Sequence, residues 1–218
     1  MLFYLYALAD DLADVSGLTG LESAPLALLP VGEVTVVGAW LTQTPAVERA
    51  DLITQDRVVR ELHTRAAALL PMRFGTGKDD LDAAARAVEA LGSLKTRLDL
   101  VRGRDQMTMR VLAAPAPAAP AAPAMDTGAG TRYLASRAAK AIPRELAPIL
   151  DALGRLQRAT RVEASRQAGL IGTVYQLVDR AAGDEYRRAA EDAASKFPNL
   201  TVRVTGPSPA YAFASETR

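Results

Sequence analysis

The chain has 218 residues, 49% of them hydrophobic, and its 26 lysines and arginines almost balance 25 acidic residues, which leaves a net charge of +1. A chain of this length can bury one full-sized core or two small ones, and its near-neutral charge leaves no footprint for nucleic acid and no polybasic patch for a membrane surface. The absence of cysteine excludes disulfides and thiolate metal sites, and the single histidine excludes a multi-histidine metal site within one chain.

No apolar run approaches the roughly 20 residues that a bilayer-spanning helix needs. The apolar stretch at residues 1–8 has no basic lead-in and is followed by Asp10 and Asp11, so it does not have the pattern of a signal peptide. These features predict a soluble, cytoplasmic protein with no lipid membrane among its partners.

The first forty residues predict mainly β-structure. Leu2–Leu8 is apolar on both alternating faces, as expected for a central strand. Residues 27–32 predict a short strand and a turn, and residues 34–41 predict a strand that pairs with it as a hairpin. Thr44 and Pro45 then suit the N-cap and the first position of a short helix.

Two long helices are predicted next. Residues 54–69 place apolar side chains on one face at the helical period, with Thr54 in the N-cap position. Residues 79–99 repeat this pattern, and they begin with aspartates, which the helix dipole favours at that end.

Between these helices, Leu70–Thr76 alternates apolar residues with Pro71, Arg73 and Gly75, which predicts a strand at a sheet edge. Arg73 places a charge in this apolar run. Such an arginine either reaches water or meets a carboxylate or a partner. The pattern therefore leaves two interpretations open, an edge strand with a solvated arginine and a functional segment.

Residues 103–112 predict a further strand, with Met107, Met109 and Val111 on one face. The predicted order is strand, hairpin, helix, strand, helix, strand. It favours an α+β sandwich in which one sheet is covered by two helices, close to a ferredoxin-like arrangement with an extra strand. We therefore expect residues 1–112 to form an N-terminal ferredoxin-like α+β domain.

An Ala/Pro-rich linker is expected over residues 113–130, since its prolines forbid a continuous helix and favour an extended chain. Residues 131–218 then predict a C-terminal α+β domain with helices and a small sheet. Its first helix follows an apolar period from Tyr133 to Leu156, which Pro143 and Pro148 interrupt unless they lie in a first turn.

The rest of this domain predicts strands at residues 170–178 and 201–205, and a helix at residues 184–196 between them. Residues 206–214 predict an extended tail. Its aromatic side chains, Tyr211 and Phe213, need a surface to pack on.

No catalytic or cofactor motif is present. The sequence has no complete phosphate-binding loop, no glycine-rich dinucleotide turn and no Gly-x-Ser-x-Gly elbow. Gly75–Lys78 matches only part of a phosphate-binding loop, and Asp79 and Asp80 would repel phosphate there. His63 lies at the margin of an apolar stripe, where a histidine is more often a packing residue than a catalyst. We expect no catalytic residues, no cofactor and no metal, and a binding or assembly protein rather than an enzyme.

Several segments, in their order and spacing, resemble the gas vesicle protein F/L family (GvpF/GvpL). They are Leu2–Ala7, Leu70–Thr76, Tyr133–Arg137, Tyr175–Arg180 and Thr205–Phe213. The tail departs from the family's usual Gly-Pro-Trp-Pro-Pro-Tyr, because Ser208 and Ala210 replace the tryptophan and the last proline. The resemblance implies a two-domain accessory protein, located in the cytoplasm and at the gas vesicle. It also implies binding to the hydrophobic shell protein GvpA and to other accessory Gvp proteins, in support of vesicle nucleation.

We expect the interaction surface to include Arg73, Phe74, Tyr211 and Phe213, because aromatic residues and arginine are enriched at interface centres. The alternative is that Phe74 lies in the core and that the two tail aromatics only hold the tail against the protein's own sheet. A different functional hypothesis is a small-ligand enzyme or sensor on a ferredoxin-like domain. A deep pocket holding His63 with a carboxylate partner would favour it. The sequence predicts no oligomeric state.

Overall fold

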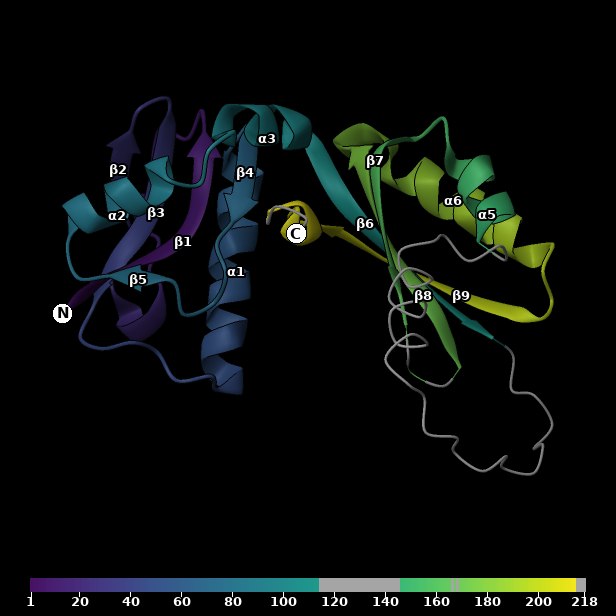
Figure 1. Ribbon diagram of the computed structural model, residues 1–218, viewed down its shortest axis with the longest axis horizontal. Helices are drawn as coiled ribbons and strands as arrows, with labels where there is room; N and C mark the ends of the chain where they lie inside the picture. The colour runs from purple at the N-terminus through teal and green to yellow at the C-terminus, as the bar shows by residue number, and fades with distance from the viewer. Residues whose placement is uncertain (114–145, 166, 168, 215–218) are drawn as a thin grey trace, which may run out of the picture. The chain divides into compact units, whose positions relative to one another are not determined.

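The computed structural model describes residues 1–113, 146–165, 167 and 169–214, and the chain divides into two compact units (Figure 1). Unit 1 comprises residues 1–104 and the segment that starts at Ser208, and unit 2 comprises Asp105–Pro207. Each unit contains one sheet with helices packed on it. The predicted α+β class is therefore confirmed, and the ferredoxin-like assignment of the first part stays a prediction.

The sheet of unit 1 has the order β2-β3-β1-β4, and β5 also pairs with β1. All of these pairings are antiparallel. The strands are β1 (Leu2–Asp10), β2 (Ala27–Val31), β3 (Val34–Leu41), β4 (Ala68–Pro71) and β5 (Gly77–Lys78). The sequence predicted β1 and the β2–β3 hairpin correctly, because their apolar, β-branched runs are long and bounded by turn residues.

Strand β1 is buried on both of its faces. Phe3 to Ala9 are each at most 1% exposed, which explains why the run carries no polar alternation. A register shift between Leu5 and Ala7 adds one residue opposite β3. Because this bulge changes the alternation, Tyr4, Tyr6 and also Ala7 join the same core cluster.

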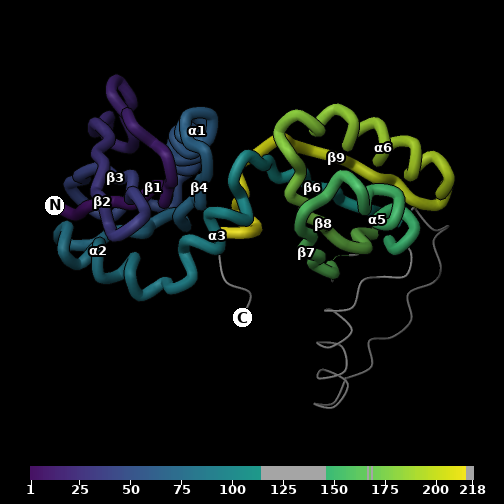
Figure 2. The backbone as a smooth tube through the Cα atoms, turned by 90° about the horizontal axis from the view of Figure 1, so that it is seen from above, coloured from purple at the N-terminus to yellow at the C-terminus, as the bar shows by residue number. Residues whose placement is uncertain are grey.

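Three helices cover this sheet, namely α1 (Arg49–Arg65), α2 (Leu81–Glu89) and α3 (Leu94–Val101). Figure 2 shows α1 on one side of the β1–β3 layer and α2 on the other. Val58, Val59 and Leu62 of α1 belong to the core cluster that contains Tyr4 and Tyr6. The predicted sheet covered by two helices is therefore a sheet with helices on both faces.

The boundaries of the first long helix were wrong at both ends. No separate helix forms at Thr44, and α1 begins at Arg49, so Thr54 lies inside it and its hydroxyl donates to the Ala50 carbonyl at 3.0 Å. At the other end Ala66 is extended, and Leu69 pairs with Ala9 in the sheet. The apolar period continued through the alanines into β4, so periodicity alone did not mark the helix end.

The second long helix is two helices. Gly92 and Ser93 have φ values of 57° and 48°, which a right-handed helix cannot contain, so α2 and α3 are separate. The expected acidic start is present, because Asp80 caps α2 and its carboxylate accepts from the Ala83 N–H at 2.6 Å.

The sheet of unit 2 has the order β7-β8-β6-β9. Its strands are β6 (Arg104–Ala113), β7 (Gln157–Ala164), β8 (Leu170–Asp179) and β9 (Leu200–Ser208). The sequence predicted β6, β8 and the centre of β9, but it gave no strand at residues 157–164. It also placed β6 in the first sheet, whereas β6 lies between β8 and β9, so a domain boundary after residue 112 divides the second sheet.

The core of unit 2 lies between this sheet and helices α5 (Ala147–Leu153) and α6 (Gly183–Ser195). Met107, Met109 and Val111 are fully buried there, as their alternation predicted, and Tyr186 of α6 joins them. Pro148 lies in the first turn of α5, where a missing N–H is tolerated.

The remaining short elements are η1 (Leu21–Ser23), η2 (Arg180–Ala182) and η3 (Tyr211–Phe213), each a single 3-10 turn. The expected tail is thus partly strand, through Ser208, and partly a turn of 3-10 helix. The Ala/Pro-rich linker lies outside the described residues except for Ala113, which ends β6, and the predicted helix start at Tyr133 also lies outside them.

Candidate binding groove

The segment after β4 is a tight turn rather than the predicted continuous strand. Strand β4 ends at Pro71, a turn follows at Phe74–Gly75, and β5 begins at Gly77. Gly75 has a φ of 81°, a value that disfavours any residue with a side chain. The alternation of Leu70–Thr76 predicts a continuous strand, but Phe74 and Gly75 fit that period by chance and form the turn. We call residues 72–76 the rim turn.

Hydrogen bonds from the core hold the rim turn in place. The hydroxyl of Tyr4 accepts from the Gly75 N–H at 3.0 Å and donates to the side-chain carbonyl of Gln55. The amide of Gln55 donates in turn to the Met72 carbonyl at 3.1 Å. Because Tyr4 is 0% and Gln55 5% exposed, these bonds are shielded from water and fix the backbone of the turn.

The rings under the rim turn extend this support. Phe74 packs edge-on against Tyr4, with ring centroids 6.3 Å apart, and it contacts the core cluster of α1 and β1 from its margin. Burial raises the pKa of Tyr4, and it raises the pKa of Tyr6 to about 12. Both hydroxyls therefore stay protonated near neutral pH and act as neutral hydrogen-bond groups.

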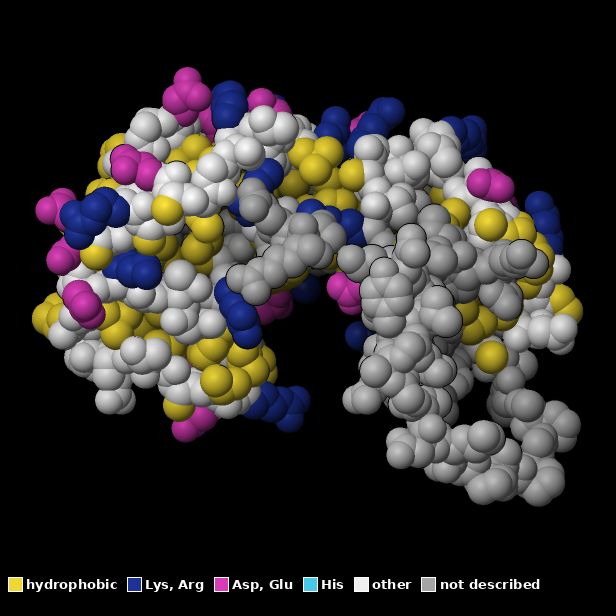
Figure 3. Space-filling view, viewed as in Figure 1, with side chains coloured by type: hydrophobic (Ala, Val, Ile, Leu, Met, Phe, Trp, Pro, Cys, Tyr) yellow, Lys and Arg dark blue, Asp and Glu magenta, His cyan; other side chains and the backbone are white. Residues whose placement is uncertain are grey.

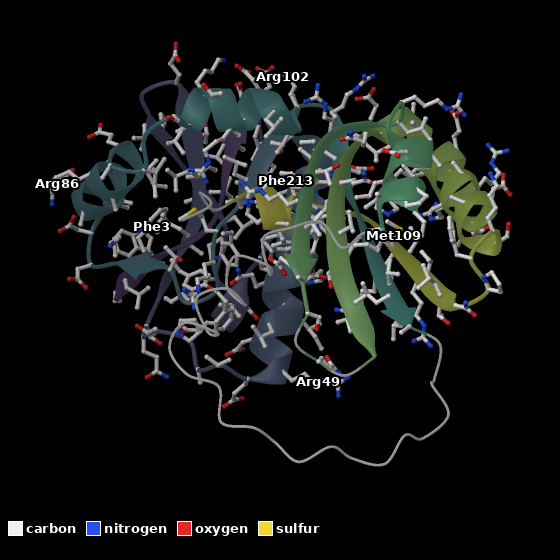
Figure 4. All side chains as sticks on the ribbon, turned by 45° about the vertical axis from the view of Figure 1, so that its right-hand side comes forward. Phe3, Arg49, Arg86, Arg102, Met109 and Phe213 are labelled. Atoms are coloured by element: carbon white, nitrogen blue, oxygen red, sulfur yellow. The ribbon has the colours of Figure 1, made fainter. Side chains whose placement is uncertain are left out.

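The tail brings a second wall to the rim turn, because η3 contacts β4 within unit 1. Phe213 is only 3% exposed, and Figure 4 shows it on the short yellow helix, η3. Tyr211 is 37% exposed, and its hydroxyl donates to the Asp56 carboxylate at 2.9 Å. Burial, with the negative charge of Asp56, raises the pKa of the Tyr211 hydroxyl.

These elements enclose a groove of about 740 Å³, and all of its lining residues belong to unit 1. We call it the rim groove. Its lining comes from the ends of β1 and β4, the rim turn, α1, the end of α2, α3 and the tail: Leu8, Leu52, Gln55, Asp56, Leu70, Pro71, Met72, Arg73, Phe74, Thr76, Ala90, Leu91, Arg97, Tyr211 and Ala214.

The rim groove is mostly apolar and reaches the surface. Leu52, Leu91 and Tyr211 are each about two fifths exposed, at 43%, 37% and 37%. Outside the groove lining, Val47 before α1 and Ile53 on α1 are also exposed, and Figure 3 shows hydrophobic side chains over the lower end of α1. A mostly apolar groove with exposed lining residues is typical of a surface that contacts another protein.

The structure brings three of the four predicted interaction residues to this groove. Arg73 is exposed on the rim turn, Phe74 is partly buried beside it, and Tyr211 faces it from the tail. Phe213 is a core residue and does not line the groove. His63 is half-buried on α1 and also lies outside the lining.

The groove residues that helices contribute could not be identified from the sequence. Leu91 lay in the helix expected over residues 79–99, but nothing local distinguished its exposed position from a core position. Leu52 lay before the expected helix start at Thr54, whereas α1 begins at Arg49. Gln55 lies inside a predicted helix, where a buried amide that holds a distant backbone carbonyl leaves no sequence signal.

The residues that the structure describes contain neither a candidate metal site nor a helix that could span a membrane. Within these ranges, no three histidine, aspartate or glutamate side chains gather as a metal site would require. None of the described helices combines the length and the apolar character needed to cross a bilayer.

Comparison with known proteins gives a fold and a family. The structure is similar to the crystal structure of the gas vesicle protein GvpF from Anabaena sp. PCC7120, with a TM-score of 0.74, 16% identity, and coverage of 100% of this chain and 97% of that one. It is similarly related to the crystal structure of GvpF from Microcystis aeruginosa, with a TM-score of 0.74, 14% identity and coverage of 99% of both chains.

At these identities, the two structures establish the fold alone. No curated protein sequence matches the chain. The family profile described as "Gas vesicle synthesis protein GvpL/GvpF" matches residues 2–215. Because that match spans nearly the whole chain, and because the fold agrees, this protein belongs to the gas vesicle synthesis protein GvpL/GvpF family.

Proposed function

We propose that this chain is a gas vesicle accessory protein that binds the hydrophobic shell protein GvpA and other accessory Gvp proteins, and so supports vesicle nucleation. It would act in the cytoplasm and at the growing vesicle, by binding rather than by catalysis. Membership of the GvpL/GvpF family supports the gas vesicle role. The observation that carries the binding role is the apolar rim groove with its exposed Leu52, Leu91 and Tyr211.

The groove has the physical character that an apolar client needs. A mostly hydrophobic lining gains free energy when it is removed from water together with a client's apolar side chains. The rim turn is already fixed by Tyr4 and Gln55, so its backbone loses little freedom on binding. We place Arg73, Phe74 and Tyr211 in the interface. Phe213, which is buried, would instead hold η3 against the core of unit 1.

The small-ligand enzyme or sensor receives no support from His63, which lies outside the groove lining. Asp56 is the lining carboxylate, and it already accepts from Arg60 at 2.6 Å and from Tyr211 at 2.9 Å.

The binding role can be tested with two neighbouring leucine-like side chains on α1. Leu52 lines the groove, and Ile53 is more exposed, at 58%, but does not line it. We expect Leu52→Asp to reduce capture of GvpA at least about tenfold, because the charged carboxylate replaces an apolar contact and has to lose its hydration when the client binds. Ile53→Asp adds the same charge one residue away, and it should capture GvpA as the wild type does.

Both positions are exposed in the first two turns of α1, so neither variant should unfold the protein, and circular dichroism can verify this. Equal capture of GvpA by the two variants would exclude the rim groove as the binding surface. Truncation before Gly206 is a poor alternative, since it removes Phe213 and Ala210 from the core of unit 1.

A further inference from the structure

The charges of the rim groove are unequally satisfied. Three lining residues are charged, namely Asp56, Arg73 and Arg97. Asp56 is fully engaged, because one of its oxygens accepts from Arg60 and the other from Tyr211. The negative charge of Asp56 is therefore already balanced within the protein.

Arg97 extends from α3 to the tail, where its Nη2 donates to the Ala214 carbonyl. Its Nε is buried and has no hydrogen-bond partner among the described residues. A carbonyl oxygen carries only a partial charge and does not neutralise the guanidinium. Among the described residues, no carboxylate forms an ion pair with Arg97. A buried donor in this state gains free energy when an acceptor arrives.

Arg73 is exposed on the rim turn and makes no ion pair with any residue that the structure describes. The backbone beneath it is held by Thr76, whose N–H and hydroxyl both donate to the Arg73 carbonyl, at 3.1 and 2.6 Å. The guanidinium is thus presented on a fixed backbone at the edge of an apolar surface.

We propose that the rim groove recognises an apolar segment of a partner protein that carries an acidic side chain, and that Arg73 and Arg97 bind its carboxylate. This inference rests on the proposed function and specifies the chemistry of the client. Arginine suits the task because its planar guanidinium matches a carboxylate with two parallel hydrogen bonds. The apolar lining excludes water from that contact and strengthens it.

The test uses the full chain and two synthetic apolar peptides that differ at one position, glutamate in one and glutamine in the other. We expect the wild type to bind the glutamate peptide about tenfold more tightly. Hydrogen bonds between charged groups are roughly twice as strong as neutral ones, and a tenfold change in affinity corresponds to about 1.4 kcal/mol. The preference should decrease with added salt.

Replacement of the arginines should remove the preference without removing binding. In Arg73→Gln with Arg97→Gln, the two peptides should bind equally, at the affinity of the glutamine peptide for the wild type. Arg73→Gln alone carries no folding risk, since Arg73 is exposed, and it should reduce the preference. The matched control is Arg86→Gln, because Arg86 points outward from α2 (Figure 4) and does not line the groove.

The outcomes separate this inference from the proposed function. If Leu52→Asp abolishes GvpA capture but wild type binds both peptides equally, the groove binds its client and carboxylate recognition is wrong. If Leu52→Asp also leaves capture unchanged, both proposals are wrong.

Two other occupants are distinguishable. If the glutamate peptide binds only after residues 215–218 are removed, the groove is occupied by the chain's own segment, which includes Glu216, and the inference is overturned. If the wild type is a dimer that Leu52→Asp separates, the occupant is a second copy, with the same consequence.

Discussion

The two sheets of this chain are covered differently by their helices. In unit 1, helices lie on both faces of the sheet, and β1 is buried along Phe3–Ala9. In unit 2, α5 and α6 belong to one core cluster with the sheet, and β9 alternates between partly buried and exposed residues along its whole length. A sheet packed on both faces has less room to adjust, so we expect matched substitutions to destabilise unit 1 more than unit 2.

The largest contrast is expected from a glycine in each sheet. A β-carbon at Gly38 of β3 would lie 2.5 Å from the Phe3 ring and 2.6 Å from the Tyr4 carbonyl oxygen. At Gly172 of β8 the nearest atom would be the Glu163 carbonyl oxygen, at 3.1 Å. We expect Gly38→Ala to lower the free energy of unfolding by about 3 kcal/mol and Gly172→Ala by about 1 kcal/mol or less.

Urea unfolding can measure this contrast. Trp40, the single tryptophan, lies on β3 with its ring 5.4 Å from that of Phe3, so its fluorescence follows unit 1. Circular dichroism follows both units. Equal losses for the two glycine variants would contradict the view that cover on both faces makes the first sheet less adaptable.

A smaller effect is expected from a buried tyrosine hydroxyl in each unit. Tyr4→Phe leaves two groups without their partner, the Gln55 side-chain carbonyl and the Gly75 N–H. Tyr186→Phe leaves only the Gln176 side-chain carbonyl, which accepts from Tyr186 at 2.6 Å. We expect Tyr4→Phe to lower the free energy of unfolding by about 2 kcal/mol and Tyr186→Phe by about 1 kcal/mol. The same urea measurement checks both values.

Tyr4→Phe should also loosen the rim turn, which Tyr186→Phe should not affect. Hydrogen exchange of the Gly75 N–H can detect this, because that amide loses its acceptor. An unchanged exchange rate in Tyr4→Phe would mean that other contacts fix the turn.

The smallest effect concerns acid stability. Asp10, at the end of β1, accepts from Arg102, and this hydrogen bond lowers the pKa of its carboxyl group. A pKa lowered by folding stabilises the protein above the unfolded value of about 3.9, and the contribution disappears as the pH falls through the folded pKa. We expect Asp10→Asn to lower the free energy of unfolding by about 1 kcal/mol or less at pH 7.

The difference in the free energy of unfolding between the wild type and Asp10→Asn should therefore become smaller as the pH decreases towards about 3. Unit 2 offers a comparison in the pair Arg158–Asp179, which is 2.6 Å apart with both side chains more than 40% exposed. Water screens that pair more strongly, so Asp179→Asn should change stability less. If Asp10→Asn lowers the free energy of unfolding by the same amount at every pH, the ion pair with Arg102 is not the cause of the loss.

The same contrast between sheets explains which elements the sequence could predict. The apolar runs of β1 and β3 and the alternating methionines of β6 are strong local signals, and each became a strand. Strand β7 reads Gln-Arg-Ala-Thr-Arg-Val-Glu-Ala, with few apolar residues, so its place is decided by pairing with β8 rather than by its own pattern. Likewise, β6 showed its buried face but not which sheet it would join.

The candidate site was predictable only where its residues were aromatic or out of place in an apolar run. Arg73, Phe74 and Tyr211 met that description and line the groove. Phe213 met it too, but the turn of η3 places it inward. Leu52, Leu91 and Arg97 become neighbours only through the packing of three helices and the tail, which no local pattern encodes.

The chain leaves unit 1 at Arg104 and returns to it at Ser208, so unit 2 is inserted within the sequence of unit 1. A fragment that simply ends at residue 104 would lack Ala210 and Phe213, which are 0% and 3% exposed. An expression fragment of unit 1 therefore has to rejoin residues 104 and 208 through a short designed connection. Unit 2 could be excised at the same two junctions and exchanged between relatives. Such exchanges would show which unit determines each property of the protein.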